Sequence, residues 1–334
     1  MTDTAVDESW PMIEEAVFRV FDELAARNPA GHAPIGPPLD ALGWADIETE
    51  YPIAAYELLF RAQGRSLAQT DCLDRVMLAE LAAILPDPAD GIVYPNLVDG
   101  CQPGSRAGTV TGVVIGPLTL GVPRRLVVPV AGPMGTVLVG TVDAGTLTGT
   151  RLNTFDPTSQ WTSVEGPLAG PLVDATAEWS RAIAAGHRAL ATELVAQADR
   201  ALQIAVEQVT SRHQFGSAIG SFQSPRHLLA EAKAQLEGAR ALLAGAWQSG
   251  GRLPALAAKA AAGRAHRAVS DAAMQVCGAI GLTLEHDLHR YVMRGFQIDS
   301  LCGSYQDLEA RIADQLFNDY SPGSALSAIA AWPD

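Results

Sequence analysis

The stretch RHQFGSAIGSFQSPRH, from Arg212 to His227, separates two long segments that are rich in alanine and leucine. In the segment before it, apolar residues lie three or four positions apart and so form one stripe of a helix: Leu190, Leu194, Ala198, Ala201, Ala205 and Val209. We expect this helix to end near Ser211, where the following glycines permit a turn. Ser224 and Pro225 then predict the cap and the first position of the next helix. The turn between the two helices is therefore basic, aromatic and rich in glycine.

The rest of the C-terminal half continues the helical pattern. Leucines repeat every seven residues from Leu229 to Leu243, and an alanine-rich stretch runs from Leu253 to Val276. A last helical pattern extends from about Asp287 to Phe317. Four helices of this length are typical of an antiparallel four-helix bundle. We assign residues 174–334 to this C-terminal bundle.

The N-terminal half has two different patterns. Residues 1–103 form the expected N-terminal helical domain, because the apolar spacing is helical from about Ser9 to Leu85, with a break near Pro52. Glycine, proline, aspartate and asparagine between 87 and 108 indicate a linker. Short β-branched runs bounded by glycine then predict four to six strands of one sheet, in a reduced β domain at residues 104–173. The expected fold class is α+β: an N-terminal helical domain, a small antiparallel β domain and a C-terminal four-helix bundle.

The composition excludes several classes of protein. The chain has 334 residues, of which 48% are hydrophobic and 18% charged, as is typical of a globular protein. A formal net charge of −14 would repel nucleic acid. Four scattered cysteines, Cys72, Cys101, Cys277 and Cys302, suggest neither disulfides nor a zinc site, which favours a cytoplasmic location. The N-terminus lacks an apolar signal segment, and glycine, proline and arginine interrupt the most apolar tract at residues 108–142, so we expect no membrane insertion.

A second motif, QVCGAIGLTLEHDLHRY from Gln275 to Tyr291, complements the first one. Together they resemble the acyl-CoA dehydrogenase family, in which a helix ends in R-x-x-F-G, F-Q precedes a new helix, and a Q-x-x-G-G-x-G turn follows later. The matching positions are Arg212, Gln214, Phe215, Gly216, Phe222, Gln223, Gln275, Gly278 and Gly281. Ala279 stands where the second glycine of the turn is usual. The resemblance covers essentially the whole chain, because the order of domains is the same and LGWADI near Leu42 resembles the family's L-G-W stretch.

The resemblance implies that these residues bind FAD. In the family, this end of the bundle crosses a subunit interface and holds the adenosine half of an FAD whose flavin ring lies in the neighbouring subunit. A guanidinium such as that of Arg212 suits the pyrophosphate, and an aromatic ring such as that of Phe215 offers a flat contact surface. Glycines let backbone N–H groups approach the cofactor. We therefore expect FAD as the cofactor and an oligomer as the working form.

Three departures from the family all affect the catalytic half. VDGCQPGSRAGT, residues 98–109, stands where the family has a T-E-P-x-x-G-S-D-like loop that holds the flavin ring and acyl-CoA, so we expect the chain's own flavin pocket to be missing. Counted without gaps from Gly281, the family's catalytic glutamate falls on Cys302, and its alternative position falls on Gly186 or His187. None of these is the carboxylate that would accept the α-proton of the thioester. The chain is also shorter than a typical member.

This pattern resembles the non-catalytic subunit of the heteromeric actinobacterial acyl-CoA dehydrogenases that shorten steroid side chains in cholesterol degradation. The resemblance implies an α2β2 heterotetramer that uses FAD to introduce an α,β double bond into a bulky acyl-CoA. The partner subunit would supply the catalytic glutamate, and this chain would supply no catalytic residue. Two alternatives stay open: a homomeric acyl-CoA dehydrogenase whose base is Glu178 or Glu193, and a scaffold of the same fold that does not bind FAD.

Three other groups of residues carry reactive or metal-binding side chains. His286 and His289 lie on one helix face beside Asp287, but no further ligand cluster accompanies them, so we expect no metal site. Cys302 has no histidine that the sequence would pair with it as a nucleophile. Glu285 is far along the chain from both positions of the base. We therefore assign no catalytic role to these residues.

Overall fold

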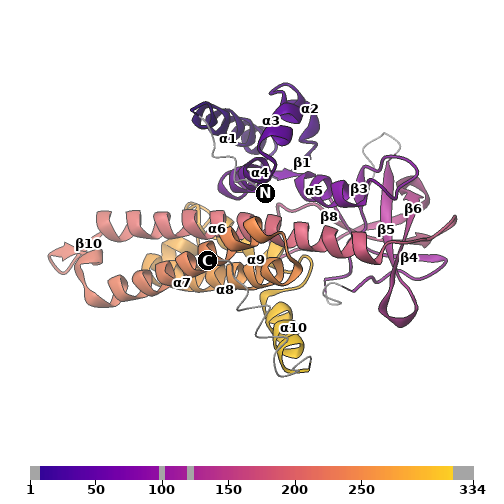
Figure 1. The fold of residues 1–334 in the computed structure, drawn as a ribbon. Coiled ribbons are helices and arrows are strands. Elements are labelled where there is room, and N and C mark those ends of the chain that lie inside the picture. The colour runs from indigo at the N-terminus through magenta and orange to yellow at the C-terminus, as the bar shows by residue number, and fades with distance from the viewer. Residues whose placement is uncertain (1–7, 98–101, 119–123, 319–334) are drawn as a thin grey trace.

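The computed structural model describes residues 8–97, 102–118 and 124–318. Figure 1 shows N-terminal helices in indigo, then strands in magenta, then long helices in orange, which confirms the predicted fold class. Cys101, the start of the divergent loop at 98–109 and the end of the expected C-terminal bundle lie outside the described residues. Within these ranges, every helix is too short or too polar to cross a lipid bilayer.

The N-terminal unit consists of helices with the bounds α1 Trp10–Arg27, α2 Gly36–Asp40, α3 Trp44–Glu50, α4 Pro52–Ser66 and α5 Cys72–Leu81. The predicted break is confirmed, because Pro52 begins α4, at a position where a missing backbone N–H costs nothing. A pair of parallel two-residue strands, β1 His32–Ala33 and β2 Gln69–Thr70, ties the helices together. This unit sits directly on the longest helix of the protein: a Cβ at Gly64 of α4 would lie 2.6 Å from the carbonyl oxygen of Glu193.

The strands form two sheets, not the single sheet that the sequence predicted. The strand bounds are β3 Gly91–Ile92, β4 Thr109–Ile115, β5 Arg125–Ala131, β6 Val137–Asp143, β7 Thr148–Arg151, β8 Trp161–Pro167 and β9 Val173–Asp174. One sheet has the order β3-β5-β6-β9 and the other β4-β8-β7. The reason lies in β5, which is buried on both faces: Val127 packs into the main core, while Leu126 and Val128 pack into a second core between the sheets. A sheet covered on both faces needs a second layer.

The predicted linker at 87–108 is in part an ordered segment that forms a strand and packs into the core. Gly91–Ile92 forms β3 and pairs with β5 in parallel. Tyr94 is fully buried, and its hydroxyl donates to Asp74 Oδ1 at 2.8 Å. The other oxygen of this buried carboxylate lies 3.2 Å from the guanidinium of Arg124. The segment therefore packs into the fold through Tyr94, which takes part in a buried hydrogen-bond network with Asp74.

The four-helix bundle consists of α6 Thr176–Ser211, α7 Gln223–Ser249, α8 Arg252–Cys277 and α9 Leu288–Asp299. All six residues of the predicted stripe on α6 are buried, and α6 ends at Ser211 as predicted. The predicted cap at Ser224 is wrong. The helix begins two residues earlier than predicted, at Gln223, with extended Phe222 as its cap residue and no capping side chain.

The last predicted helix, over 287–317, is in fact two helices. α9 ends at Asp299, and α10, Tyr305–Asn318, packs on α8 and points away from the bundle (Figure 1). The break occurs because Cys302 and Gly303 adopt left-handed backbone angles, with φ of 56° and 94°. Left-handed residues end a right-handed helix.

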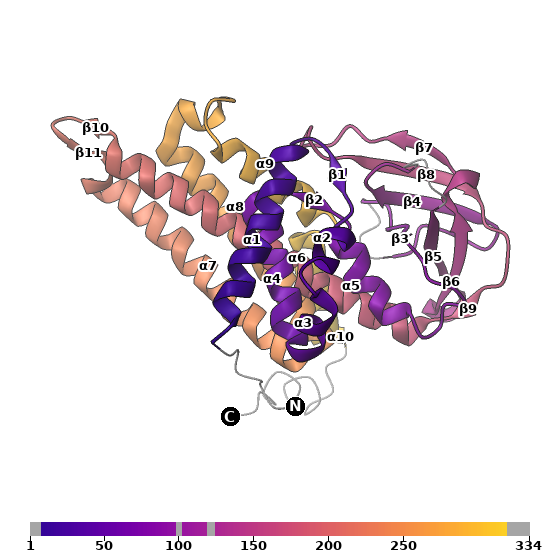
Figure 2. The same cartoon turned by 90° about the horizontal axis from the view of Figure 1, so that it is seen from above.

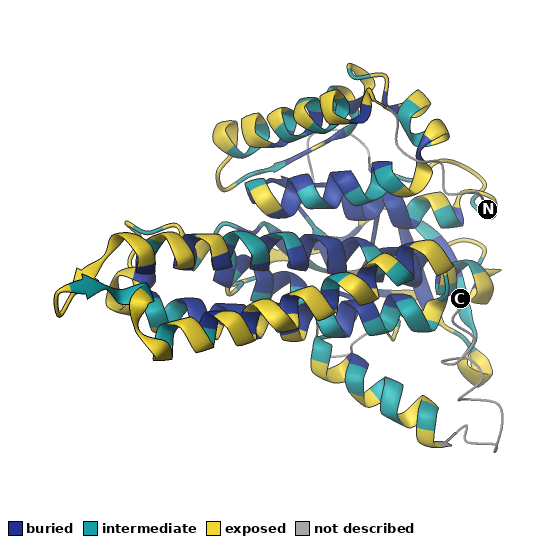
Figure 3. Ribbon diagram, turned by 60° about the vertical axis from the view of Figure 1, so that its left-hand side comes forward, coloured by how far each residue is buried: buried dark blue, intermediate teal, exposed yellow. Residues whose placement is uncertain are grey.

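Figure 3 shows where the core lies. Buried residues, in dark blue, fill the space between α4 and α6 and the interior of the bundle, whereas the outer faces of the long helices are exposed. The bundle therefore has its own hydrophobic interior and shares α6 with the N-terminal unit.

Candidate functional site

The two sequence motifs lie at the same end of the bundle. Because neighbouring long helices are antiparallel, the C-terminal end of α6, the N-terminal end of α7 and the C-terminal end of α8 meet there (Figure 2). Between α6 and α7 the chain forms a hairpin of β10 His213–Gln214 and β11 Ser217–Ala218, followed by the 3-10 turn η3 Ile219–Ser221. Phe215 and Gly216 make the hairpin turn with positive φ angles of 52° and 79°.

The aromatic residues of the hairpin point out of the fold. The Phe215 side chain is 92% exposed and that of Phe222 is 40% exposed. Their rings stand edge to face with centroids 6.3 Å apart. Holding Phe215 in a left-handed conformation costs free energy, of order 1–3 kcal/mol, and the exposed ring gains no burial in return. Such a strained and exposed aromatic residue is better explained by binding than by folding.

The glycines of the second motif each have a steric reason. Gly278 ends α8 with φ 67° and ψ −148°, a conformation close to the region that only glycine adopts readily. The following 3-10 turn, η4 Gly278–Leu282, contains Gly281, at which a Cβ would lie 3.0 Å from the Cβ of Cys277. Leu282 and Leu284, which sequence analysis did not single out, are 69% and 88% exposed beside this turn.

The predicted FAD-binding residues are therefore gathered at one exposed end. Arg212, Gln214, Phe215, Gly216, Phe222, Gln223, Gln275 and Gly278 are exposed, and only Gly281 is buried. In the described part of the chain, the guanidinium of Arg212 has no hydrogen bond or ion pair. What these nine residues bind stays a prediction.

The two positions that the sequence predicts to correspond to the family's base lie side by side. His187 Nε2 is 3.0 Å from the carbonyl oxygen of Cys302, and both residues are buried. Burial, reinforced by the charge of Lys259, lowers the pKa of His187 to about 3, so the ring is neutral at physiological pH. A Cβ at Gly186 would lie 2.9 Å from the sulfur of Met77, which leaves no room for a larger side chain. Neither position offers a carboxylate.

A buried lysine, which the sequence analysis missed, fixes the loop that carries Cys302. Lys259 is 0% exposed, and its ammonium donates to the carbonyl oxygens of Asp299 at 2.8 Å and Gly303 at 2.5 Å. It also lies 3.7 Å from Asp299 Oδ1. The only signal in the sequence is that lysine is rare, since Lys233 and Lys259 are the two lysines among 23 basic residues.

The two alternative bases, Glu193 and Glu178, have side-chain partners within the fold. Glu193 is buried, and both its oxygens accept hydrogen bonds from amides, those of Gln63 at 2.8 Å and Gln197 at 3.2 Å. Burial raises the pKa of Glu193 to about 7. Glu178 is half-buried near the start of α6 and forms an ion pair with Arg181 at 3.2 Å. Both carboxylates are engaged by neighbouring side chains.

The residues considered for a metal site make local contacts. His289 Nδ1 lies 2.7 Å from the carbonyl oxygen of His286, and Asp287 forms an ion pair with Arg290 at the start of α9. Among the described residues, no group of three or more histidine, cysteine, aspartate or glutamate side chains has a geometry that could hold a metal ion.

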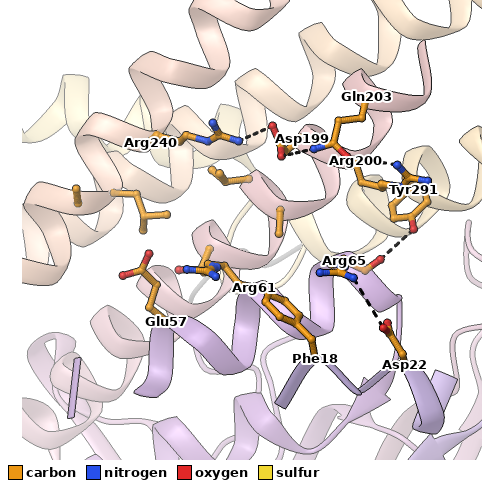
Figure 4. Close-up of a pocket in the computed structure, with 15 residues that line it drawn as sticks. Phe18, Asp22, Glu57, Arg61, Arg65, Asp199, Arg200, Gln203, Arg240 and Tyr291 are labelled. Atoms are coloured by element: carbon orange, nitrogen blue, oxygen red, sulfur yellow. Dashed lines mark hydrogen bonds and ion pairs between the residues drawn. The ribbon is translucent and has the colours of Figure 1, made fainter. Parts of the chain in front are cut away.

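Two cavities lie elsewhere on the bundle. A cleft of about 310 Å³ opens beside His187, between α6, α8 and α10, and contains Arg252 and Arg311. A larger cleft of about 970 Å³ separates α1 and α4 from α6, α7 and α9 (Figure 4). Neither cleft is lined by any of the nine residues predicted to bind FAD.

Comparison with a family model and with known proteins finds similarity to acyl-CoA dehydrogenases. The model of the acyl-CoA dehydrogenase C-terminal domain matches residues 180–303. Acyl-CoA dehydrogenase IpdE2 of Mycobacterium tuberculosis is 29% identical over 253 residues, covering 72% of this chain and 77% of that protein. Its namesake from Mycolicibacterium smegmatis is 31% identical over 128 residues, covering 38% of this chain and 41% of that protein.

Solved structures of the same fold cover nearly the whole chain. One from the steroid ACAD Tcur3481-Tcur3483 has a TM-score of 0.73 and 21% identity, and covers 93% of this chain and 98% of that chain. Another, from the ChsE4-ChsE5 complex of Mycobacterium tuberculosis, has a TM-score of 0.72 and 21% identity, and covers 96% and 100%. Both motifs lie on helix ends within residues 180–303, the part of the chain that matches the acyl-CoA dehydrogenase C-terminal domain.

Proposed function

We propose that this chain is the non-catalytic subunit of a heteromeric, FAD-dependent acyl-CoA dehydrogenase. The observation that carries the proposal is the contrast between the two ends of α6. Near its start, both positions of the base are occupied by buried residues without a carboxylate, His187 and Cys302. At its far end, the residues that resemble the family's adenosine site are exposed. This combination suits a chain that contributes cofactor contacts to a shared site, while the partner subunit abstracts the proton.

The exposed end has the chemistry that the adenosine half of FAD needs. The guanidinium of Arg212 has no partner within residues 8–97, 102–118 and 124–318, so it is available for charge-assisted hydrogen bonds to a pyrophosphate. Phe215 offers an apolar ring surface to adenine, and nothing lies within 4 Å of the position of a Cβ at Gly216 or Gly278, so a ligand can approach the backbone. These residues would bind and orient the cofactor, which when bound supplies the hydride acceptor for desaturation.

The partner would be a second acyl-CoA dehydrogenase chain that provides the flavin pocket and the catalytic glutamate in an α2β2 heterotetramer. Support comes from the ChsE4-ChsE5 complex and the Tcur3481-Tcur3483 steroid ACAD, whose names each join two components. We propose a bulky acyl-CoA as the substrate, with a steroid side-chain thioester as the first choice, because similar proteins include a steroid ACAD. The reaction would introduce an α,β double bond.

Co-expression tests this function directly. The chain is produced alone and, one at a time, with acyl-CoA dehydrogenase-like chains of the same genome, and flavin absorbance and acyl-CoA desaturation are measured after purification. We expect a colourless, inactive protein alone and a yellow, active complex with one partner. A yellow homo-oligomer that desaturates acyl-CoA by itself would overturn the proposal. If Arg212→Ala leaves the flavin content of the complex unchanged, the chain acts as a scaffold and not as a holder of the cofactor.

A further inference from the structure

The large cleft between the N-terminal unit and the bundle is built from charged walls and an apolar floor. One wall comes from α1 and α4, the other from α6, α7 and α9, and Val195 and Leu243 are part of the floor. The walls are joined where the Tyr291 hydroxyl donates to the Arg65 carbonyl oxygen at 2.9 Å (Figure 4). The cleft is lined by different residues from the two base positions and the exposed end of the bundle, so neither of those sites explains it.

The arginines of the cleft are all neutralised by neighbouring carboxylates. The ion pairs are Arg61–Glu14, Arg65–Asp22, Arg200–Glu207 and Arg240–Asp199. Two of these guanidinium groups lie over the Phe18 ring, that of Arg65 4.5 Å and that of Arg61 5.6 Å from its centroid. The cleft therefore has no free arginine that would attract an anionic ligand.

Among the described residues that line the cleft, Glu57 is the charged side chain without an ion-pair partner. Its carboxylate points into the cavity in Figure 4 and has no hydrogen bond or ion pair within the described residues. Burial raises the pKa of Glu57, since the nearby Arg61 offsets the loss of water only in part. A half-buried carboxylate without a partner is unfavourable, and a cation that entered the cleft would relieve this cost.

The composition and size of the cleft suit a protein segment. Arginine and aromatic residues are enriched where subunits meet, and this cleft contains four arginines together with Phe18 and Tyr291. A volume of about 970 Å³ is close to that of two turns of helix, which we estimate at roughly 900 Å³ from a helix about 10 Å wide. A single amino group or metal ion would leave most of this space empty.

The surface next to the cleft also permits close approach of a helix. Helix α7 lines the cleft through Arg240, Leu243 and Ala244, and its exposed small residues include Ala234, Gly238, Ala241 and Ala244. Nothing lies within 4 Å of the position of a Cβ at Gly238. The strongly acidic chain, with a net charge of −14, favours a basic partner surface.

We propose that this cleft, together with the adjoining face of α7, is the docking surface for a helix of the partner subunit that places a lysine or arginine against Glu57. The inference rests on the proposed function, because its occupant is the second subunit of the heteromer. It adds a contact surface far from the FAD-binding motifs, and it explains why an unpaired carboxylate is kept between paired ones.

Charge reversal at Glu57 tests the inference in the co-purified complex. The dissociation constant of the two subunits is measured for the wild type, Glu57→Gln, Glu57→Lys and a control, Glu165→Lys, which lies on the exposed side of β8. We expect Glu57→Lys to weaken assembly by at least about tenfold, Glu57→Gln to weaken it by less, and Glu165→Lys to leave it unchanged. Thermal unfolding of each isolated variant shows that the fold is intact. A complex that assembles equally well with Glu57→Lys overturns the inference and leaves the proposed function standing.

A photo-crosslinker identifies the occupant independently. p-Benzoylphenylalanine is placed at Ala244 in the cleft or, as a control, at Met134, which is 99% exposed on the β5–β6 turn. We expect crosslinks from position 244, and not from 134, to a partner peptide that contains a lysine or arginine. Crosslinks from 244 to a second copy of this chain, or stabilisation of the isolated chain by spermidine that Glu57→Gln abolishes, would assign another occupant and overturn the inference. A wild-type chain that assembles with no partner contradicts the proposed function as well.

Discussion

The carboxyl group of Glu193 is surrounded by amides in the core between α4 and α6. Its pKa in the folded chain is about 7, against 4.5 for an exposed glutamate, because burial disfavours the charged form. The folded state therefore holds the proton more tightly than the unfolded state, and stability falls as the pH rises from about 5 to 7. By linkage this loss corresponds to roughly 3 kcal/mol at pH 8.

Glu193→Gln should remove this dependence, because glutamine stays neutral and its carbonyl still accepts from Gln63. We expect the variant to gain stability relative to the wild type as the pH rises from 5 to 8, measured by thermal unfolding in matched buffers. The same variant in the active complex should keep its desaturase activity. Loss of activity with an unchanged pH profile would instead favour Glu193 as the base.

At Phe215 the predicted effect is on binding and not on stability. The ring is 92% exposed, so Phe215→Ala should change the free energy of unfolding of the isolated chain by less than about 0.5 kcal/mol. In the heteromeric complex, the same change should lower flavin retention during gel filtration, because adenine loses its contact surface. The buried Phe21→Ala serves as the contrast, with large destabilisation expected. Unchanged flavin retention in Phe215→Ala would argue against an adenosine site at this hairpin.

The residues of the two motifs could be found from the sequence. The buried Lys259 and the cleft residue Glu57 could not. Phe215 and Gly278 stand out because each belongs to a short motif whose residues lie within a few positions of one another. Lys259 contacts residues 40 and 44 positions away, and Glu57 is distinctive only because its neighbours are already paired. No local pattern encodes such distant pairing.

At the scale of elements, two helical glycines allow a controlled comparison: Gly64 lies on a buried face of α4, and Gly238 lies on an exposed face of α7. Gly64 of α4 touches the backbone of α6, so Gly64→Ala should force the helices apart and destabilise the chain by roughly 1–3 kcal/mol. Gly238 on α7 faces open space, so Gly238→Ala should stabilise it by about 0.5–1 kcal/mol. Urea unfolding of both variants measures the difference. Equal effects at the two sites would contradict the close contact between α4 and α6.

The long helices were predictable because their apolar spacing is strong and local, as in the buried stripe from Leu190 to Val209 on α6. The second sheet was not, because pairing of β4 with β8 joins residues such as Val110 and Gly166 that are far apart in the chain. The break between α9 and α10 was missed for a different reason. Cys302 is a non-glycine residue in a left-handed conformation, which sequence patterns do not signal.

At the scale of the whole molecule, a buried ion pair ties the β region to the bundle. Arg294 of α9 lies 2.6 Å from Asp156 in the loop before β8. Burial alone would raise the pKa of Asp156, but Arg294 and Thr158 hold it below its usual value. Arg294→Met should leave a buried carboxylate unpaired and cost about 3–5 kcal/mol at pH 7, with a smaller loss in acid as Asp156 becomes protonated.

The control for this change lies on the same helix. Arg290 is exposed and pairs with Asp287, so Arg290→Met should alter stability by at most about 1 kcal/mol. Differential scanning calorimetry compares the two variants. If Arg294→Met were as mild as Arg290→Met, the contact between the β region and the bundle would not depend on this pair.

We propose that this chain binds the adenosine half of an FAD, and that the partner subunit supplies the flavin pocket and the catalytic glutamate. The most direct measurement is the structure of the purified heteromeric complex with FAD and a non-reactive acyl-CoA bound. We predict the adenosine half of FAD against Arg212 and Phe215 of this chain, and the flavin ring and a catalytic glutamate within the partner. An FAD held entirely by this chain, with one of its own carboxylates facing the α-carbon of the thioester, would contradict the account.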